Sequence, residues 1–171
     1  MRMKMNKPSS TYLISVRPRW ADAFFLDRNP KTIELRKGNF GTSLKAGDSI
    51  VIYSTLPVGE AIGTVKVVRR ELLTVDRLWQ ESQQGQLAKV SRQQFETYYT
   101  NQESGVGVWV SAAELFPSQI ALCRLRQNWG QRWQPPQQIQ QLNDDQMAAL
   151  NIAHAHIAHA REPSATLLWI I

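Results

Sequence analysis

Cysteine and histidine are scarce in this sequence. Its 171 residues include one cysteine, Cys123, and three histidines. A single cysteine excludes an intrachain disulfide and a cysteine-based zinc site, and it is typical of a protein of the reducing cytoplasm. His154, His156 and His159 are clustered, but on a helix only His156 and His159 would share a face. We therefore expect no metal and no other cofactor.

Long apolar runs are also lacking. No segment approaches the roughly 18 uncharged apolar residues that a membrane span requires. The basic start of the chain, Met1 to Pro8, is not followed by the apolar core of a signal peptide. The sequence contains no phosphate-cradling glycine loop, no GxSxG motif and no metalloprotease helix. These absences predict a soluble, cytoplasmic protein without those catalytic motifs.

Acidic residues are fewer than basic ones. The chain has 14 Asp and Glu against 20 Lys and Arg, for a net charge of +6, and 43% of its residues are hydrophobic. The length and apolar content predict about one domain with a real core, and the charge favours an anionic partner such as nucleic acid. Six basic residues form a candidate track for a nucleic-acid backbone, the alternative being solvated strand ends: Lys66, Arg69, Arg70, Arg124, Arg126 and Arg132.

The short stretch Asn29 to Lys37, just before a glycine-rich turn at Gly38 to Gly41, combines charged and apolar residues. If it is a strand, alternation places Ile33 and Leu35 on one face and Glu34 and Arg36 on the other. Lys31 enters from the preceding turn, so an ammonium, a carboxylate and a guanidinium converge on one small volume. Such a triplet suits a ligand with phosphate oxygens and base edges. The alternative is a solvated surface ion pair, worth about 0 to 1 kcal/mol.

The strand and helix signals are mixed. Apolar, β-branched runs predict strands, and capped segments with helical spacing predict helices. The expected strands are residues 11–17, 32–37, 49–54, 59–69, 105–112 and 119–126, and the expected helices are residues 21–28, 75–83, 91–100 and 144–160. Cys123 falls in the last strand and is predicted to be buried. The order predicts an α+β fold, a small mixed β-barrel, partly open, with helices at its ends.

The chain divides into three parts. Residues 1–10 are predicted to be a flexible leader, residues 11–142 the barrel domain, and residues 143–171 a C-terminal helix with an apolar tail. Residues 127–142, rich in glutamine, are predicted to form an extended strap on the barrel. The tail ends in the apolar run Leu167 to Ile171. We expect it to be buried against its own domain or in a homodimer, or to dock a protein partner.

Four stretches of the chain share one family pattern. Residues 29–36 read Asn-Pro-Lys-Thr-Ile-Glu-Leu-Arg, and further stretches follow the family order at Ile14 to Trp20, Lys45 to Asp48 and Pro135 to Gln137. They resemble the ASCH domains of the PUA-like superfamily, small β-barrel domains usually linked to RNA, whose pattern is Gly-x-Lys-x-x-Glu-x-Arg. This chain has Asn29 at the glycine position. The resemblance covers about residues 11–142, and it implies a PUA-like barrel with RNA as a partner.

The resemblance and the charged triplet together predict a cleft that binds RNA or a modified nucleoside. In this cleft Lys31 and Arg36 hold phosphate or a base edge, and Glu34 accepts hydrogen bonds from a base amino group. The ends of the neighbouring strands supply phosphate contacts, a stacking surface and pocket walls. The candidate ligand-binding residues are Arg17, Arg19, Trp20, Lys31, Glu34, Arg36, Tyr53 and Ser54.

The alternative is a hydrolase acting on RNA, with Lys31 and Glu34 as catalytic residues. Some members of the family resemble ribonucleases, and another branch removes the acetyl group of N4-acetylcytidine. That branch has Thr where this chain has Glu34, and its distant Glu would fall in residues 86–89, which contain no carboxylate. A general base needs a pKa near the working pH, whereas Glu34 between two cations is expected to stay ionised. A binding domain is therefore favoured.

Overall fold

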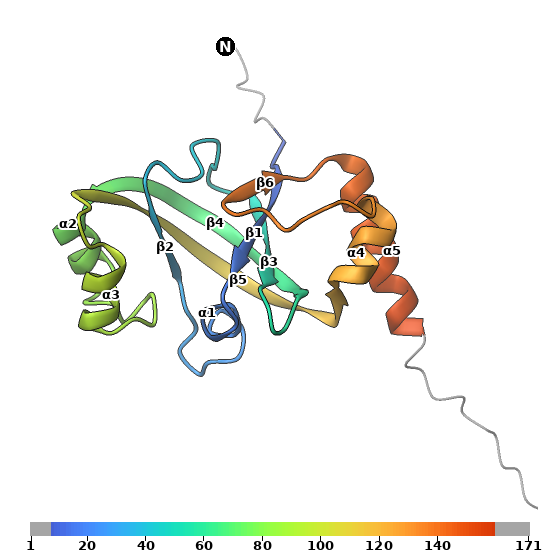
Figure 1. Ribbon diagram of the computed structural model, residues 1–171, viewed down its shortest axis with the longest axis horizontal. Coiled ribbons are helices and arrows are strands. Elements are labelled where there is room, and N and C mark those ends of the chain that lie inside the picture. Colours follow the sequence, from blue (N-terminus) through green and yellow to red (C-terminus); the bar gives the residue numbers. More distant parts are fainter. Residues whose placement is uncertain (1–7, 160–171) are drawn as a thin grey trace, which may run out of the picture.

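The apolar runs of the sequence assemble into one curled sheet. The computed structural model describes residues 8–159, and for residues 152–159 only the backbone helix. The strands are β1 (Thr11–Val16), β2 (Ile33–Lys37), β3 (Ser49–Ser54), β4 (Glu60–Thr74), β5 (Ser104–Ala121) and β6 (Ile139–Gln141). Their order across the sheet is β2-β5-β4-β3-β1-β6. The sheet curls into a half-barrel, so the predicted α+β class and the partly open barrel are confirmed (Figure 1).

Two long strands, β4 and β5, bend this sheet. They pair antiparallel, and their register shifts at three places; such bulges increase the local twist. Gly63 lies at one of them, where a Cβ atom would come within 2.8 Å of the Phe25 ring and still closer to the Glu114 carbonyl oxygen. The register passes from Gly63–Leu115 to Ala61–Ile120 with a bulge in β5 between them. The strands predicted over residues 105–112 and 119–126 are therefore parts of one strand as far as Ala121, joined by a bulge rather than separated by a turn.

Helices cover both ends of the half-barrel. At one end lie α2 (Val75–Glu81) and α3 (Arg92–Tyr98), and at the other end lie α4 (Leu122–Trp129) and α5 (Asp144–His159) (Figure 1). The fifth helix, α1 (Pro18–Asp22), follows β1 directly. This placement confirms the prediction of helices at the barrel ends.

The predicted helix caps are formed. Ser91 Oγ accepts a hydrogen bond from the Gln94 backbone nitrogen at 3.2 Å, and the Gln94 side chain accepts one from the Ser91 backbone nitrogen at 2.9 Å. This capping box satisfies two backbone donors at the start of α3. At α5, Asn143 Oδ1 accepts from the Gln146 backbone nitrogen at 2.8 Å.

The first predicted helix was misplaced. It was expected over residues 21–28, but α1 begins at Pro18 and ends at Asp22. Proline fits the first helical position because its missing N–H has no partner there in any helix. Pro18 therefore starts the helix, three residues earlier than predicted.

The strand predicted over residues 119–126 is wrong beyond Ala121. The chain turns into α4 there, because Leu125 is buried and Leu122 and Trp129 pack beside it on one helix face. Over so short a run, apolar residues at helical spacing resemble an alternating strand. Cys123 lies on the outer face of α4 and is exposed, so its predicted burial is also wrong.

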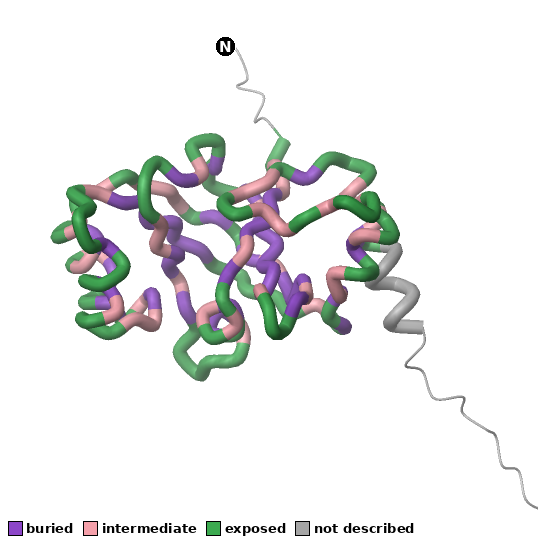
Figure 2. The backbone as a smooth tube through the Cα atoms, viewed as in Figure 1, coloured by how far each residue is buried: buried purple, intermediate pink, exposed green. Residues whose placement is uncertain are grey.

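The core has two layers, one on each side of the central strands. Tyr12 and Ile14 of β1 pack inside the half-barrel, while Leu13 packs on the opposite side in a cluster with Leu125 and Leu150. Buried residues accordingly concentrate along the middle of the sheet (Figure 2). Because β1 and β3 are covered on both faces, they read as nearly continuous apolar runs.

The C-terminal helix begins in contact with the barrel. Leu150 of α5 is 3% exposed and belongs to the same cluster as the barrel residue Leu13. The division of the chain at residue 143 stays a prediction. The side chains of the three histidines, most of the leader and the apolar tail lie outside the described residues. Among the helices of the described part, none is long and apolar enough to cross a membrane.

Candidate functional site

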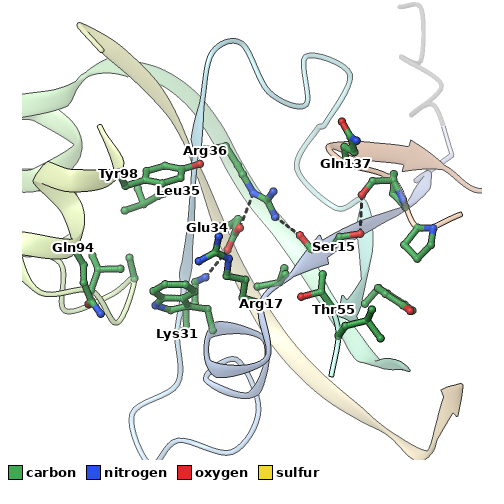
Figure 3. Close-up of a pocket in the computed structure, with 18 of the residues that line it drawn as sticks. Ser15, Arg17, Lys31, Glu34, Leu35, Arg36, Thr55, Gln94, Tyr98 and Gln137 are labelled. Atoms are coloured by element: carbon green, nitrogen blue, oxygen red, sulfur yellow. Dashed lines mark hydrogen bonds and ion pairs between the residues drawn. The ribbon is translucent and has the colours of Figure 1, made fainter. Parts of the chain in front are cut away.

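A cavity opens where the half-barrel does not close. β6 pairs only with Tyr12, Leu13 and Ile14, so the end of β1 has no strand beside it on that side. The edge strand β2 curls toward this gap, and Arg36 Nη2 donates a hydrogen bond to the Ser15 carbonyl oxygen at 2.8 Å. Side chains thus join the two strands in place of a backbone ladder. We call the cavity between β1 and β2, about 870 Å³ in volume, the seam cleft (Figure 3).

Three charged side chains form the floor of the seam cleft. Glu34 Oε2 accepts a hydrogen bond from Lys31 Nζ, and Glu34 Oε1 accepts one from Arg36 Nε at 2.7 Å. Lys31 and Glu34 are each only 5% exposed. We call these three residues the charged cluster; Figure 3 shows them meeting beside Ser15. An exposed surface ion pair, the simplest alternative reading of the sequence, is excluded by this burial.

The backbone of β2 places the cluster as alternation predicts. Ile33 is fully buried against Trp109 and Ala88 on the other face of the strand. Before the strand, the Lys31 backbone nitrogen donates to the Ala23 carbonyl oxygen at 2.8 Å, which fixes the turn that brings its side chain inward. The convergence of an ammonium, a carboxylate and a guanidinium was thus predictable from the spacing of the charged residues.

Burial and mutual attraction compete within the cluster. Burial lowers the pKa of Lys31 below its usual range, and the neighbouring Glu34 offsets this only in part. Burial alone would raise the pKa of Glu34, but the charges and hydrogen bonds of Lys31 and Arg36 outweigh it and hold that pKa below its usual value. Glu34 is therefore ionised at neutral pH and a weak base.

Aromatic rings support the two cations. Lys31 Nζ lies 4.6 Å from the centre of the Phe24 ring, and the Arg36 guanidinium carbon lies 5.0 Å from that of Phe40. The electron-rich ring faces attract cations, so each ring stabilises the charge above it. Phe24 and Phe40 are buried, at 1% and 3% exposure, and they hold both cations in fixed positions.

Apart from Arg17, the walls of the seam cleft are uncharged and combine aliphatic, aromatic, amide and hydroxyl side chains. On one side, α3 contributes Gln94 and Tyr98, and on the other side lie Thr55 and Gln137 (Figure 3). The strap segment is tied to β1 by Ser15 Oγ, which donates to the Pro136 carbonyl oxygen at 2.7 Å. A ligand in the cleft therefore meets charge at the floor and neutral, partly aromatic surface along the walls.

Six of the eight candidate residues line the seam cleft: Arg17, Trp20, Lys31, Glu34, Arg36 and Tyr53. The other two lie outside it. Arg19 is exposed on α1, with its guanidinium carbon 5.8 Å from the centre of the Trp20 ring, and Ser54 is fully buried at the end of β3. On a strand, Tyr53 and Ser54 face opposite ways, so only one of them could reach the cavity.

The predicted second basic track is not continuous. Arg69 stacks 3.7 Å above the Trp109 ring and pairs with Glu71, and Arg70 donates to the Phe40 carbonyl oxygen at 2.9 Å. These residues lie in the second half of β4, whereas Arg124 and Arg126 lie on α4 at the opposite end of the half-barrel (Figure 1). These four cations therefore form two separate groups.

The wall supplied by α3 was missed in the sequence. Gln94 and Tyr98 line the seam cleft, but nothing in their spacing distinguishes them from ordinary helix residues. Their role depends on how α2 and α3 pack back over β2, through Phe95 and Tyr99 against Leu35. The strap was the better signal, since its paired prolines matched the family pattern and Pro136 does line the cleft.

Comparison with known proteins places the fold. No family model matches the sequence, and no curated protein matches it either. The structure is similar to that of ASCH from Zymomonas mobilis, with 26% identity and a TM-score of 0.75 over 84% of this chain and 94% of that one. The N-terminal domain of Staphylothermus marinus McrB shares the fold, at 10% identity and a TM-score of 0.54 over 92% and 99% of the two chains. The half-barrel, the Lys-Glu-Arg cluster and this similarity agree, and the chain has the fold of the ASCH domain proteins.

Proposed function

We propose that the protein binds nucleic acid, or a modified nucleoside derived from it, in the seam cleft, and that RNA is its principal ligand. One observation carries the proposal: a buried cluster of two cations and one carboxylate forms the floor of a large cavity that is open to solvent. Taking charges out of water costs several kcal/mol per ion. Three such groups at the floor of a cavity, rather than in the solid core, are best explained by a ligand that uses them.

The walls fit the other parts of a nucleotide. Trp20 and Tyr98 offer ring surface for a base, and Gln94 and Gln137 offer amide donors and acceptors to its edge. Arg17 is exposed at the mouth of the cleft, where a phosphate of an incoming strand would pass. The net charge of +6 adds long-range attraction for a polyanion.

Salt-dependent binding tests this proposal. Anisotropy titrations of labelled single-stranded RNA and DNA should give affinities that fall with salt, with a log–log slope of about −2 if three phosphates are neutralised. Lys31→Ala and Arg36→Ala should each weaken the complex. Arg77→Ala, which removes the same charge from an exposed position on α2 outside the cleft, serves as the matched control. Full-strength binding by both cleft variants would refute the assignment of the cleft.

Hydrolysis of RNA or of an acetylated nucleoside is the second candidate, and the burial of Lys31 favours it. A buried amine with a lowered pKa exchanges protons more readily near neutral pH than an exposed lysine does. Incubation with total RNA and with N4-acetylcytidine, followed by mass spectrometry, separates the two functions. Product that disappears in a Lys31→Ala/Glu34→Ala variant would establish catalysis, whereas retained RNA without product would leave a binding domain.

A further inference from the structure

The charges that line the seam cleft do not balance. Among the described lining residues, three are cations, Arg17, Lys31 and Arg36, and Glu34 is the single carboxylate. The lining therefore carries a net charge of +2. The remaining lining side chains are apolar, hydroxyl, amide or aromatic, and none of them offers a compensating negative charge.

Part of this excess is buried at the floor. Each carboxylate oxygen of Glu34 already accepts a hydrogen bond, one from Lys31 and one from Arg36, so one negative charge serves two cations. The Lys31 side chain is 5% exposed and that of Arg36 is 16% exposed. An excess positive charge in such surroundings is costly unless an anion completes it.

The Arg36 guanidinium is fixed by two hydrogen bonds and has donors left for an anion. Its Nε atom donates to Glu34 and its Nη2 atom donates to the Ser15 carbonyl oxygen. Within the part of the chain that the structure describes, the other terminal nitrogen, Nη1, donates no hydrogen bond. A fixed guanidinium with unused donors is well suited to phosphate oxygens, which it binds with charge-assisted hydrogen bonds.

The floor is also closed underneath. Lys31 rests on Phe24 and Arg36 rests on Phe40, and both rings belong to the core cluster inside the half-barrel. The end of a ligand can reach such a floor directly. An internal phosphate of a strand would require the chain to descend to the floor and turn back within the same cavity.

We infer that the charged cluster at the floor of the seam cleft receives a phosphate monoester, the terminal phosphate of a mononucleotide or of a nucleic-acid strand. This inference rests on the proposed function and names the part of the ligand that the floor recognises. A phosphate monoester carries about −1.5 to −2 charges at neutral pH, which matches the +2 that the charged cluster and Arg17 carry together. An internal phosphodiester carries about −1 and leaves part of the excess uncompensated.

Oligonucleotides that differ only at their ends test the inference. Isothermal titration calorimetry compares one short single-stranded RNA with a 5′-phosphate, with a 3′-phosphate and with two hydroxyl ends, together with the matching mononucleotide, the nucleoside and inorganic phosphate. A terminal phosphate at one of the two ends should tighten binding by at least about tenfold, since hydrogen bonds to charged groups are worth that much or more. The mononucleotide should also bind more tightly than inorganic phosphate.

Two variants keep the test independent of folding. Arg36→Gln should abolish the preference for a phosphorylated end, and Arg17→Gln, at an exposed position, should reduce it without disturbing the buried cluster. Arg77→Gln, at a position on α2 that is 60% exposed and outside the cleft, should leave the preference intact. These results together would support the inference.

Three results would overturn it. If the three oligonucleotides bind with equal affinity and Arg36→Gln weakens the binding of all three, the proposed function stands and the terminal-phosphate inference fails. If inorganic phosphate binds as tightly as the mononucleotide, the floor is a simple anion site and the inference fails in its nucleotide part. If no RNA, nucleotide or nucleoside binds, the proposed function fails as well.

Discussion

Replacing Glu34 should destabilise the protein far more than replacing Lys31. Glu34→Gln keeps the shape of the side chain but leaves Lys31 and Arg36 buried without a counter-charge. Removing one partner of a buried ion pair costs about 3 to 5 kcal/mol of unfolding free energy. Lys31→Met leaves Glu34 paired with Arg36 at 2.7 Å and fills the same volume, so its cost should be near the roughly 1 kcal/mol of one hydrogen bond.

Urea unfolding followed by tryptophan fluorescence measures this difference, since the chain contains six tryptophans. In both variants the unfolding free energy should fall with urea concentration at the wild-type slope, because the surface exposed on unfolding does not change. Glu96→Gln is the matched control. Glu96 pairs with Arg92 on the outside of α3, and both side chains are nearly 60% exposed. The control should therefore lose no more unfolding free energy than the roughly 0.5 kcal/mol typical of such pairs.

The pH dependence gives an independent check. The folded protein holds the pKa of Glu34 below its ordinary value of 4.5, so this residue adds stability that is present above pH 4.5 and is lost as the pH falls through the folded value. The difference in unfolding free energy between wild type and Glu34→Gln should therefore be constant near pH 7 and should disappear at acid pH. A Glu34→Gln variant within 1 kcal/mol of wild type at pH 7, or one no less stable than Lys31→Met, would refute the reasoning.

Four further outcomes are expected. Gly63→Ala should lower stability by about 1 to 3 kcal/mol in the same urea assay, because the new Cβ would lie 2.8 Å from the Phe25 ring; an unchanged midpoint would contradict that contact. Ser91→Ala removes the α3 cap and should cost about 1 kcal/mol by thermal unfolding, and no shift would mean that the cap is not formed in solution. Cys123 should react with a thiol reagent in the native protein at nearly the unfolded rate, as slow labelling would place it in the core. Deleting residues 164–171 should cause aggregation or dissociation to monomers in light scattering, and unchanged mass and solubility would exclude both roles of the tail.

The charged cluster could be predicted because one strand carries it. The alternation of Ile33 and Leu35 against Glu34 and Arg36 is a local property, and Lys31 needed only the turn before it. The burial of the cluster could not be predicted this way. It results from the curl of the whole sheet, which brings β1 to face β2.

The wrong predictions share one physical cause, the influence of distant partners on local pattern. The run after Ala121 forms α4 because the core cluster offers a place for one helix face, which its own alternation does not reveal. The strands predicted over residues 105–112 and 119–126 join into β5 because β4 pairs with the chain on both sides of the bulge between Leu115 and Ile120. Likewise, Arg19 and Ser54 are next to cleft residues in sequence, but the backbone directs their side chains elsewhere.

The missing ladder between β1 and β2 sets the mechanical character of the cleft. In a closed barrel, widening the gap between two strands breaks a row of backbone hydrogen bonds together. Here the two strands are joined by the Arg36 guanidinium, which donates one hydrogen bond to the Ser15 carbonyl oxygen at 2.8 Å. Opening the gap between these two strands therefore breaks one side-chain hydrogen bond rather than a row of backbone ones.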